Sequence, residues 1–325
     1  MELAWSDPTS PDLVVGADEL VELPAGPVSL AEFLAECGRT LGDPTAPDAV
    51  WRDRFLTAGL VALRQAPDGR RWVAVGLRCA AEPSTELWAE LAGTARELLA
   101  GPASDFFFMR KAPGLRLRFE ATDEARVSRL REALWDSADG WRRAGLVAEV
   151  TPAVYEPEQQ LFGGARSMRH VHRLFTVDSL AWLDFHAGAA GDVPAWRFSL
   201  SLLRALMDGL GVVGWEDLDV WDRIRRQAFR TLPASVIGRD AFVRAATGVR
   251  AAWAATGDGA DPVARVRSEV TMVASRWSTD YFAGPDACVG PREACTFATI
   301  FHWNRGGLSM LRQGLLAEVL AERRP

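Results

Sequence analysis

Two arginines spaced two residues apart are the first groups in this sequence that could do chemistry. Arg116 and Arg118 alternate with leucine and phenylalanine, and a side-chain period of two puts charged and apolar residues on opposite faces of a strand. Guanidinium groups on one face could hydrogen-bond the oxygens of a bound molecule. An antiparallel sheet often has one solvated face, so the same two residues could instead be ordinary surface charges.

Histidine is sparse, and the four histidines are candidates for proton transfer near neutral pH. His302 lies in the sequence FHWNRGG among polar and aromatic neighbours, which makes it the better catalytic candidate, although a single histidine can also be structural. His170 and His172 would share a face on a strand but diverge on a helix. The sequence favours a helix here, which argues against a metal site made by this pair.

The usual catalytic and metal-binding motifs are missing. The sequence has no G-x-S-x-G, no P-loop, no H-E-x-x-H and no dinucleotide-binding glycine pattern. The four cysteines, Cys37, Cys79, Cys288 and Cys295, form no C-x-x-C pair, so they indicate neither a zinc site nor a disulfide framework. We therefore expect no metal and no cofactor.

The two arginines are expected to lie on a β-hairpin. A Pro-Gly pair at 113–114 separates two apolar runs between Asp105 and Glu120, and proline followed by glycine is typical of a tight turn. A strand at 71–77 precedes the hairpin, and so does a helix that Ser84 or Thr85 opens and Gly101-Pro102 ends. A helix capped by Thr122 and a strand at 146–155 follow it. This order predicts an α+β fold, with an antiparallel or mixed sheet and helices packed on one side.

The remainder of the chain is expected to be helical. In the N-terminal region, 1–70, prolines separate two short predicted helices at 29–37 and 51–63. The region 71–325 begins with the sheet, and from Asp178 onward the pattern is almost entirely helical. Helices are predicted near 178–186, 194–210, 215–229, 239–255, 262–277 and 291–321.

Composition bounds the function classes. The chain of 325 residues has a formal net charge of −6 and ordinary globular usage. A negative charge argues against a general nucleic-acid binder, which usually has a basic excess. No apolar run is long enough for a membrane helix, and the N-terminus lacks a secretory signal pattern. These features predict a cytoplasmic protein that binds neither nucleic acid nor membrane.

Three segments together resemble a known family. FFFMRKAPGLRLRFE, then YEPEQQLFGGARSMRHVHRLFTVDS at 155–179, then FHWNRGG at 301–307 are similar in order and spacing to the C-terminal domain of class I lanthipeptide dehydratases and its stand-alone thiopeptide relatives. The resemblance covers roughly residues 70 to 325. In that family these segments face one cavity, which implies that the arginine face of the hairpin lies inside it.

Two positions distinguish the two activities of this family. The lyase members eliminate glutamate from glutamyl esters of serine or threonine, with the pattern P-E-x-x-R-Y-G-G and a histidine four positions before an Asn-Arg pair. Here Leu161 stands at the arginine position and Ile300 at the histidine position. Leucine cannot bind a carboxylate and isoleucine cannot transfer a proton. The resemblance therefore implies the other activity, that of the thiopeptide pyridine synthases.

Pyridine synthases join two dehydroalanines of one modified peptide by a formal [4+2] aza-cycloaddition, and loss of water and the leader peptide leaves a pyridine-centred macrocycle. The resemblance implies modest acid and base catalysis of amide tautomerisation and water loss. His302 would take the place of the lyase histidine if a strand or tight turn re-aims it. The catalytic candidates are Tyr155, Glu158, Asp178, Ser179 and His302, and the substrate-binding candidates are Arg116, Arg118, Trp303, Asn304 and Arg305.

The implied substrate is a modified precursor peptide with a leader and a core of azoles and dehydroalanines, and partner dehydratase proteins are possible associates. The region 1–70 is either a leader-docking element or part of the same body as the catalytic domain, 71–325. Two alternatives stay open. The chain could be the glutamate-eliminating lyase subunit of a split dehydratase, or a non-catalytic scaffold that binds the leader peptide.

Overall fold

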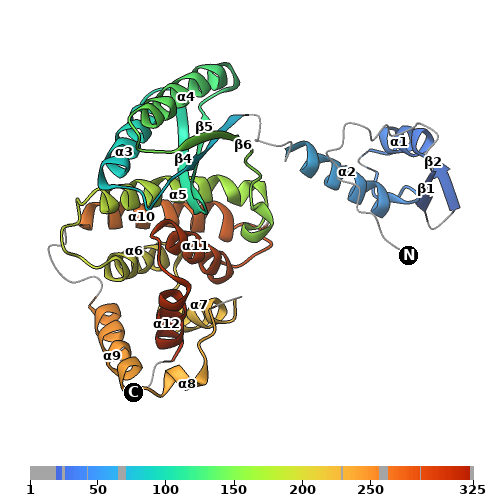
Figure 1. Cartoon of the computed structure of the whole chain (residues 1–325). Helices are drawn as coiled ribbons and strands as arrows, with labels where there is room; N and C mark the ends of the chain where they lie inside the picture. Colours follow the sequence, from blue (N-terminus) through green and yellow to red (C-terminus); the bar gives the residue numbers. More distant parts are fainter. Residues whose placement is uncertain are drawn as a thin grey trace. The chain divides into compact units, whose positions relative to one another are not determined.

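The computed structural model describes residues 20–23, 26–41, 43–64, 71–227, 230–255, 263–285 and 287–322. The chain divides into two compact units, Met1–Pro67 and Asp68–Pro325 (Figure 1). The candidate site lies in the second unit. Whether the first unit docks a leader peptide stays a prediction.

The first unit contains a short antiparallel hairpin and two helices. Ser29 begins the first helix with a capping box, in which its hydroxyl accepts from the Glu32 N–H and the Glu32 carboxylate accepts from the Ser29 N–H. Phe33 packs edge-on against Phe55, with 5.2 Å between the ring centroids. Both helices predicted in this region are confirmed. The elements are β1 (Leu20–Leu23), β2 (Gly26–Ser29), α1 (Leu30–Arg39) and α2 (Ala49–Arg64).

The second unit is built on a four-stranded antiparallel sheet with the order β4-β5-β3-β6. The predicted hairpin is confirmed, with Lys111 opposite Gly114 across the turn. A Cβ at Gly114 would lie 2.0 Å from the Leu77 carbonyl oxygen, so only glycine fits where the hairpin meets the neighbouring strand. The strands are β3 (Trp72–Arg78), β4 (Ala103–Lys111), β5 (Gly114–Ala121) and β6 (Glu149–Ala153).

Helices cover both faces of this sheet, not one as the sequence suggested. On one side lie α3 (Thr85–Leu99) and α4 (Val127–Arg143), and α5 (Ala165–His186) packs along β4 on the other (Figure 1). Three consecutive phenylalanines of β4, residues 106–108, are all buried, which requires cover on both faces. The fold class is α+β, as predicted.

Several helix boundaries differ from the prediction. Asp123, not Thr122, caps the segment after the hairpin, because its side chain accepts from the Arg126 N–H of a short 3₁₀ turn. The helix predicted from 178 begins at Ala165. The helix predicted over 291–321 is two helices, α11 (Pro291–Arg305) and α12 (Met310–Ala321), because Gly307 takes a left-handed conformation between them.

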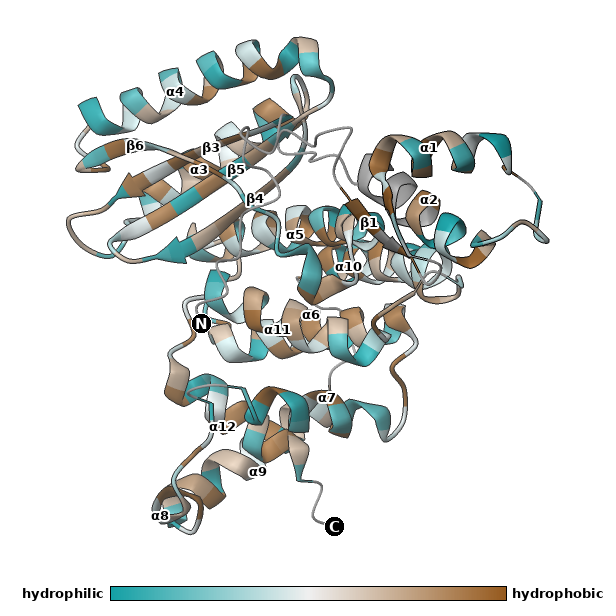
Figure 2. Cartoon of the chain, turned by 90° about the vertical axis from the view of Figure 1, so that its right-hand side faces the viewer, coloured by the Kyte–Doolittle hydropathy of each residue, from teal (hydrophilic) through white to brown (hydrophobic). Residues whose placement is uncertain are grey.

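The helical half of the unit packs beneath α5. In Figure 1 α10 lies beside α5, and α6 and α11 form the next layer. Gly209 lets α6 approach α10 closely, because a Cβ there would lie 2.6 Å from the Thr271 carbonyl oxygen. Figure 2 shows hydrophobic residues along the strands and hydrophilic bands on α4, which covers the sheet from outside. The remaining elements are α6 (Ala195–Leu210), α7 (Glu216–Arg225), α8 (Ala234–Ile237), α9 (Asp240–Ala254), α10 (Ala264–Trp277) and a π-helical turn, η4 (Ser278–Phe282).

Candidate functional site

Tyr155 lies just after β6, in a buried aromatic environment. Its ring packs edge-on against Trp72 and Phe107, with centroid distances of 4.7 and 5.3 Å. Its hydroxyl lies 2.8 Å from Nε2 of His172, on the face of α5 that meets the sheet. A strand end and a helix therefore position one phenol and one imidazole together.

Burial fixes the protonation states of this pair. Burial raises the pKa of the Tyr155 hydroxyl, and the negative charge of Glu158 raises it further. Burial also lowers the pKa of His172 to about 3, with a further contribution from the positive charge of Arg118. Both groups are thus neutral near pH 7, and the tautomer of the His172 imidazole decides which of the two atoms donates in this hydrogen bond.

Arg118 projects from β5 into the same region. Its guanidinium carbon lies 5.0 Å from the Phe107 ring centroid and 4.9 Å from that of Tyr155, which is cation–π geometry. Burial lowers the pKa of Arg118, and the charge of Glu158 opposes that shift. The two residues therefore interact electrostatically, but the described residues contain no ion pair between them.

Three polar atoms around Tyr155 are buried and have no hydrogen-bond partner. They are Trp72 Nε1, Arg118 Nη1 and Glu158 Oε2, two donors and one acceptor. Buried polar atoms are usually paired, because an unpaired one costs roughly 1–3 kcal/mol. We refer to the cluster of packed side chains formed by Tyr155, His172, Arg118, Glu158 and Trp72 as the Tyr155 chamber. Its unpaired atoms are suited to the carbonyl oxygens and N–H groups of a peptide.

A second buried network surrounds Asp178. One carboxylate oxygen lies 2.5 Å from His302 Nδ1, and the other accepts from Arg305 Nε at 2.6 Å. Burial alone would raise the pKa of Asp178, but the charges of His302 and Arg305 hold it below its usual range. Asp178 is therefore an anion held between two cationic or polar partners.

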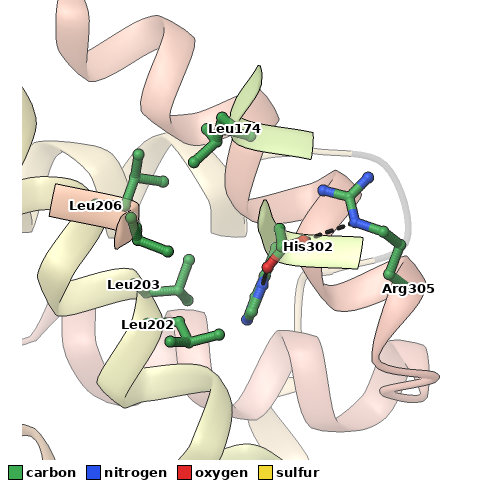
Figure 3. Close-up of a pocket in the computed structure, with 9 residues that line it drawn as sticks. Leu174, Leu202, Leu203, Leu206, His302 and Arg305 are labelled. Atoms are coloured by element: carbon green, nitrogen blue, oxygen red, sulfur yellow. Dashed lines mark hydrogen bonds and ion pairs between the residues drawn. The ribbon is translucent and has the colours of Figure 1, made fainter. Parts of the chain in front are cut away.

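This network is closed around His302. Its Nε2 lies 2.9 Å from Ser199 Oγ, which also accepts from Trp303 Nε1 at 3.0 Å. Figure 3 shows Leu174, Leu202, Leu203 and Leu206 facing His302 across a cavity that Arg305 also lines. The cavity volume is about 10 Å³, enough for about one water molecule and for no substrate.

Arg305 connects the two regions. Its guanidinium lies over the Phe175 ring at 4.3 Å, and its Nη1 is 3.8 Å from the sulfur of Met109. The charge of Glu158 in the Tyr155 chamber opposes the lowering of the Arg305 pKa that burial causes. The Asp178–His302 network therefore holds the Arg305 guanidinium in place, and the positive charge of Arg305 acts on the chamber.

The structure brings some predicted site residues together and separates others. Tyr155, Glu158 and Arg118 lie together in the chamber, and Asp178, His302 and Arg305 form the network beside it. Of the other four, Trp303 contacts this network through Ser199, and the remaining three lie outside both groups. Ser179 accepts from the Phe108 N–H at 3.3 Å, Trp303 stacks on Trp221, the Asn304 side chain accepts from Gln313 at 3.4 Å, and Arg116 is half-buried opposite Gly76 and Met109.

The condition under which His302 would replace the lyase histidine is not met. Positions 300 and 302 lie in α11, an uninterrupted helix. Two residues in a helix are separated by about 200° around its axis. Ile300 and His302 therefore point in different directions, and His302 is directed into the buried Asp178 network.

Sequence reasoning did not select His172 or Trp72 for the site. His172, Thr176 and Ser179 are spaced by four and three residues, and the latter two accept N–H groups of β4. That spacing places the three residues on one face of a helix. A helix predicted to begin after the Gly163-Gly164 pair would therefore have placed His172 on the face that meets the sheet. Both glycines have positive φ, 86° and 95°.

The part of the chain that the structure describes contains neither a metal-binding cluster nor a membrane-spanning helix. No group of three or more His, Cys, Asp or Glu side chains in it could hold a metal ion. Within the same residues, no helix has the length and apolarity needed to cross a membrane.

Two solved structures have this fold. The pyridine synthase TbtD, from thiomuracin biosynthesis, matches with a TM-score of 0.56 and 15% identity over 77% of this chain and 98% of its own. The tRNA-dependent lantibiotic dehydratase MibB, from Microbispora sp. 107891, matches with a TM-score of 0.55 and 18% identity over 77% of this chain. The match spans only 28% of the length of MibB, so it concerns one part of that enzyme.

The sequence of the chain identifies its protein family. None of the curated proteins compared with this chain matches it significantly. The model for the C-terminal part of lantibiotic biosynthesis dehydratases matches residues 72–322, about three quarters of the sequence and nearly all of the second unit. The chain is therefore a member of the lantibiotic biosynthesis dehydratase C-terminal family.

Proposed function

We propose that this protein is a pyridine synthase of thiopeptide biosynthesis. Its substrate would be a precursor peptide carrying a leader, azoles and two dehydroalanines. One dehydroalanine and its neighbouring amide, as the iminol, supply the azadiene, and the second dehydroalanine supplies the alkene. Two C–C bonds form, from the alkene end and the iminol carbon of the azadiene to the two alkene carbons of the second dehydroalanine. Loss of one water and of the leader as an amide then gives the pyridine.

The observation that carries this proposal is the set of unpaired polar atoms in the Tyr155 chamber. Arg118 Nη1 and Trp72 Nε1 are donors without acceptors, and Glu158 Oε2 is an acceptor without a donor. A substrate amide presents one acceptor and one donor, so it could satisfy atoms of both kinds. Amide tautomerisation moves a proton between those same two atoms of the substrate.

Tyr155 is the residue best placed to assist that proton movement. Its hydroxyl is neutral and can give a proton to a carbonyl oxygen, while the proton that leaves the amide nitrogen goes to Glu158 and keeps the proton count of the site unchanged. Glu158 would accept the amide N–H. The charges of Arg118 and Arg305 would stabilise negative charge that develops on the oxygen.

Much of the rate would come from positioning. Both reacting groups belong to one peptide, and holding them in contact can contribute roughly 7–11 kcal/mol to lowering the barrier. The structural match to TbtD, which extends over 98% of that pyridine synthase, supports the proposed function.

The lyase alternative is weaker. Leu161 lies in the 3₁₀ turn that follows Glu158, and Ile300 lies in α11. The arginine and the histidine of the lyase pattern are therefore absent from these two positions. An elimination needs a group to bind the glutamyl carboxylate and another to transfer a proton. The described geometry does not supply them at these two positions.

Mass spectrometry of the purified protein with a synthetic leader-bearing peptide, which contains azoles and two dehydroalanines, tests the proposal. The expected products are the free leader amide and a macrocycle that has also lost one water. No metal or nucleotide is added. A peptide that binds and returns unchanged would overturn the proposal and favour the scaffold.

A parallel reaction separates the lyase from the synthase. The same protein is incubated with a peptide that carries a glutamylated serine. Loss of glutamate with formation of dehydroalanine would identify a lyase, despite Leu161 and Ile300. An unchanged glutamyl ester together with a macrocycle in the first reaction is the result that the proposal requires.

A further inference from the structure

A large polar groove lies beside the Tyr155 chamber. Its volume is about 580 Å³, within the range of ligand sites. The beginning of β4, the end of β5 and the first turns of α5 line it, together with Asp280 of η4. All of these elements belong to the second unit.

Arginine dominates the lining of this groove. Four guanidinium groups face three carboxylates, in a protein whose net charge is −6. Glu120 is engaged by Arg71 at 2.5 Å, and Asp105 lies 3.4 Å from Arg173. Arg169 is exposed and, within the described part of the chain, has neither a hydrogen bond nor an ion pair. The groove therefore has an excess of positive charge and at least one available guanidinium.

The placement of these arginines on α5 is unfavourable for the helix. Arg166 and Arg169 lie in its first two turns, where the helix dipole favours negative side chains. The first turn contains no acidic residue, and Gly164 provides no side-chain cap. Positive side chains added to a positive helix end are compensated when an anion binds there.

The mixture of charges indicates what kind of anion fits. Carboxylates in the lining accept N–H groups, which a peptide has along its backbone and a phosphodiester chain lacks. No phenylalanine, tyrosine or tryptophan lines the groove, so nucleic-acid bases would have no aromatic surface for stacking. Acidic peptide side chains can pair with the guanidiniums, while peptide N–H groups meet the carboxylates.

The groove and the chamber share one side chain. His172 lines the groove and also holds the hydroxyl of Tyr155 at 2.8 Å. We propose that the groove binds an acidic stretch of the peptide on which the enzyme acts, and so delivers the adjoining segment to Tyr155. This inference rests on the proposed function only in taking the substrate to be a peptide.

Fluorescence anisotropy of the full-length protein tests the groove without any turnover. The probes are a labelled short peptide rich in glutamate and its counterpart with glutamine in place of glutamate. We expect the glutamate peptide alone to bind, and its binding to weaken at about 0.5 M salt. Arg169→Glu should raise its Kd at least about tenfold.

Arg129→Glu is the matched control, because Arg129 is an exposed residue of α4 outside the groove lining and the substitution changes the net charge equally. Equal effects of the two substitutions, or equal binding of the two peptides, would overturn the inference. So would tighter binding of a labelled single-stranded RNA that Arg169→Glu abolishes, since the groove would then be a nucleic-acid site.

The inference and the proposed function can fail separately. Specific binding of the glutamate peptide without pyridine formation would leave the groove assignment intact and remove the proposed reaction. Pyridine formation with an unchanged KM in Arg169→Glu, measured on a substrate with an acidic leader, would remove the groove assignment and leave the reaction intact.

Discussion

The hydroxyl of Tyr155 and Nε2 of His172 lie 2.8 Å apart, and this contact joins the segment just after β6 to the first half of α5. It also joins a chamber with unpaired buried atoms to an open, arginine-rich groove. A neutral phenol beside a neutral imidazole can both donate and accept a proton without leaving a charge behind. This pair is therefore the part of the site on which the proposed chemistry depends most.

Tyr155→Phe should lower kcat for macrocycle formation by about 10²–10⁴-fold, the usual contribution of an acid or base group. The phenylalanine ring keeps the contacts with Trp72 and Phe107, so the loss of free energy of unfolding should be only about 1 kcal/mol. Steady-state kinetics and urea unfolding measure the two quantities. An unchanged kcat would exclude Tyr155 from proton transfer.

Tyr281→Phe is the matched control, since the chain has only two tyrosines. The Tyr281 hydroxyl donates to the Gly163 carbonyl oxygen at 2.9 Å and accepts from the Cys288 N–H at 3.1 Å. We expect a similar loss of stability, about 1 kcal/mol. At a temperature where both variants are folded, kcat should stay close to that of the wild type.

The local features of the fold were predictable from the sequence, because the signals are local. The Pro-Gly pair and the alternation of residues 115–120 set the hairpin and its register. The run of Phe106, Phe107 and Phe108 already contained the sign that both faces are buried, since an alternating pattern would have left one of them polar. The alternation of apolar and charged residues on the next strand suggested instead that one face is exposed to solvent. That suggestion was misleading, because Arg118 is buried despite its charge.

The candidate site was less predictable, because it depends on contacts between distant segments. Asp178 meets His302 and Arg305 only after α5 and α11 have packed together, and no local spacing encodes that contact. FHWNRGG suggested a reactive histidine, yet a helical period directs His302 into the core. His172 was passed over for a similar reason, since the beginning of its helix depends on two glycines with positive φ.

Asp178→Asn should lower the free energy of unfolding by about 3–5 kcal/mol, because it leaves the fully buried Arg305 without its counter-charge. Its neighbour Ser179 only accepts one backbone N–H, so Ser179→Ala should cost about 1 kcal/mol. Urea unfolding of the two variants gives the comparison. Similar losses for both would mean that the Asp178–Arg305 pair contributes little to the fold.

Gly163→Ala should destabilise the protein by about 3 kcal/mol or more. The residue has φ of 86°, and an added Cβ would lie 2.1 Å from the Tyr281 hydroxyl. Gly188 has φ of 93° with no atom within 4 Å of its Cβ position, so Gly188→Ala isolates the backbone cost of roughly 1–2 kcal/mol. Thermal and urea unfolding should show that Gly163→Ala is considerably less stable than Gly188→Ala. Equal stabilities would show that Tyr281 moves aside at little cost.

Asp105→Asn should stabilise the protein at pH 7.5 and lose this advantage as the pH falls. Burial raises the pKa of Asp105 to about 6, although Arg173 and Thr176 oppose the shift. Between this value and the unfolded pKa near 3.9, the folded state binds a proton that the unfolded state does not, so Asp105 favours folding increasingly as the pH falls.

His172 contributes with the opposite sign. Its pKa is about 3 in the folded protein and near 6.5 when unfolded, so its contribution to stability is lost as the pH falls through that interval. The pH dependence of the wild type alone therefore mixes the two effects. The difference in the free energy of unfolding between Asp105→Asn and wild type isolates the effect of Asp105. It should be at most about 3 kcal/mol at pH 7.5 and should decrease steadily toward pH 4. A difference that is constant with pH would show that Asp105 titrates as an ordinary exposed carboxylate.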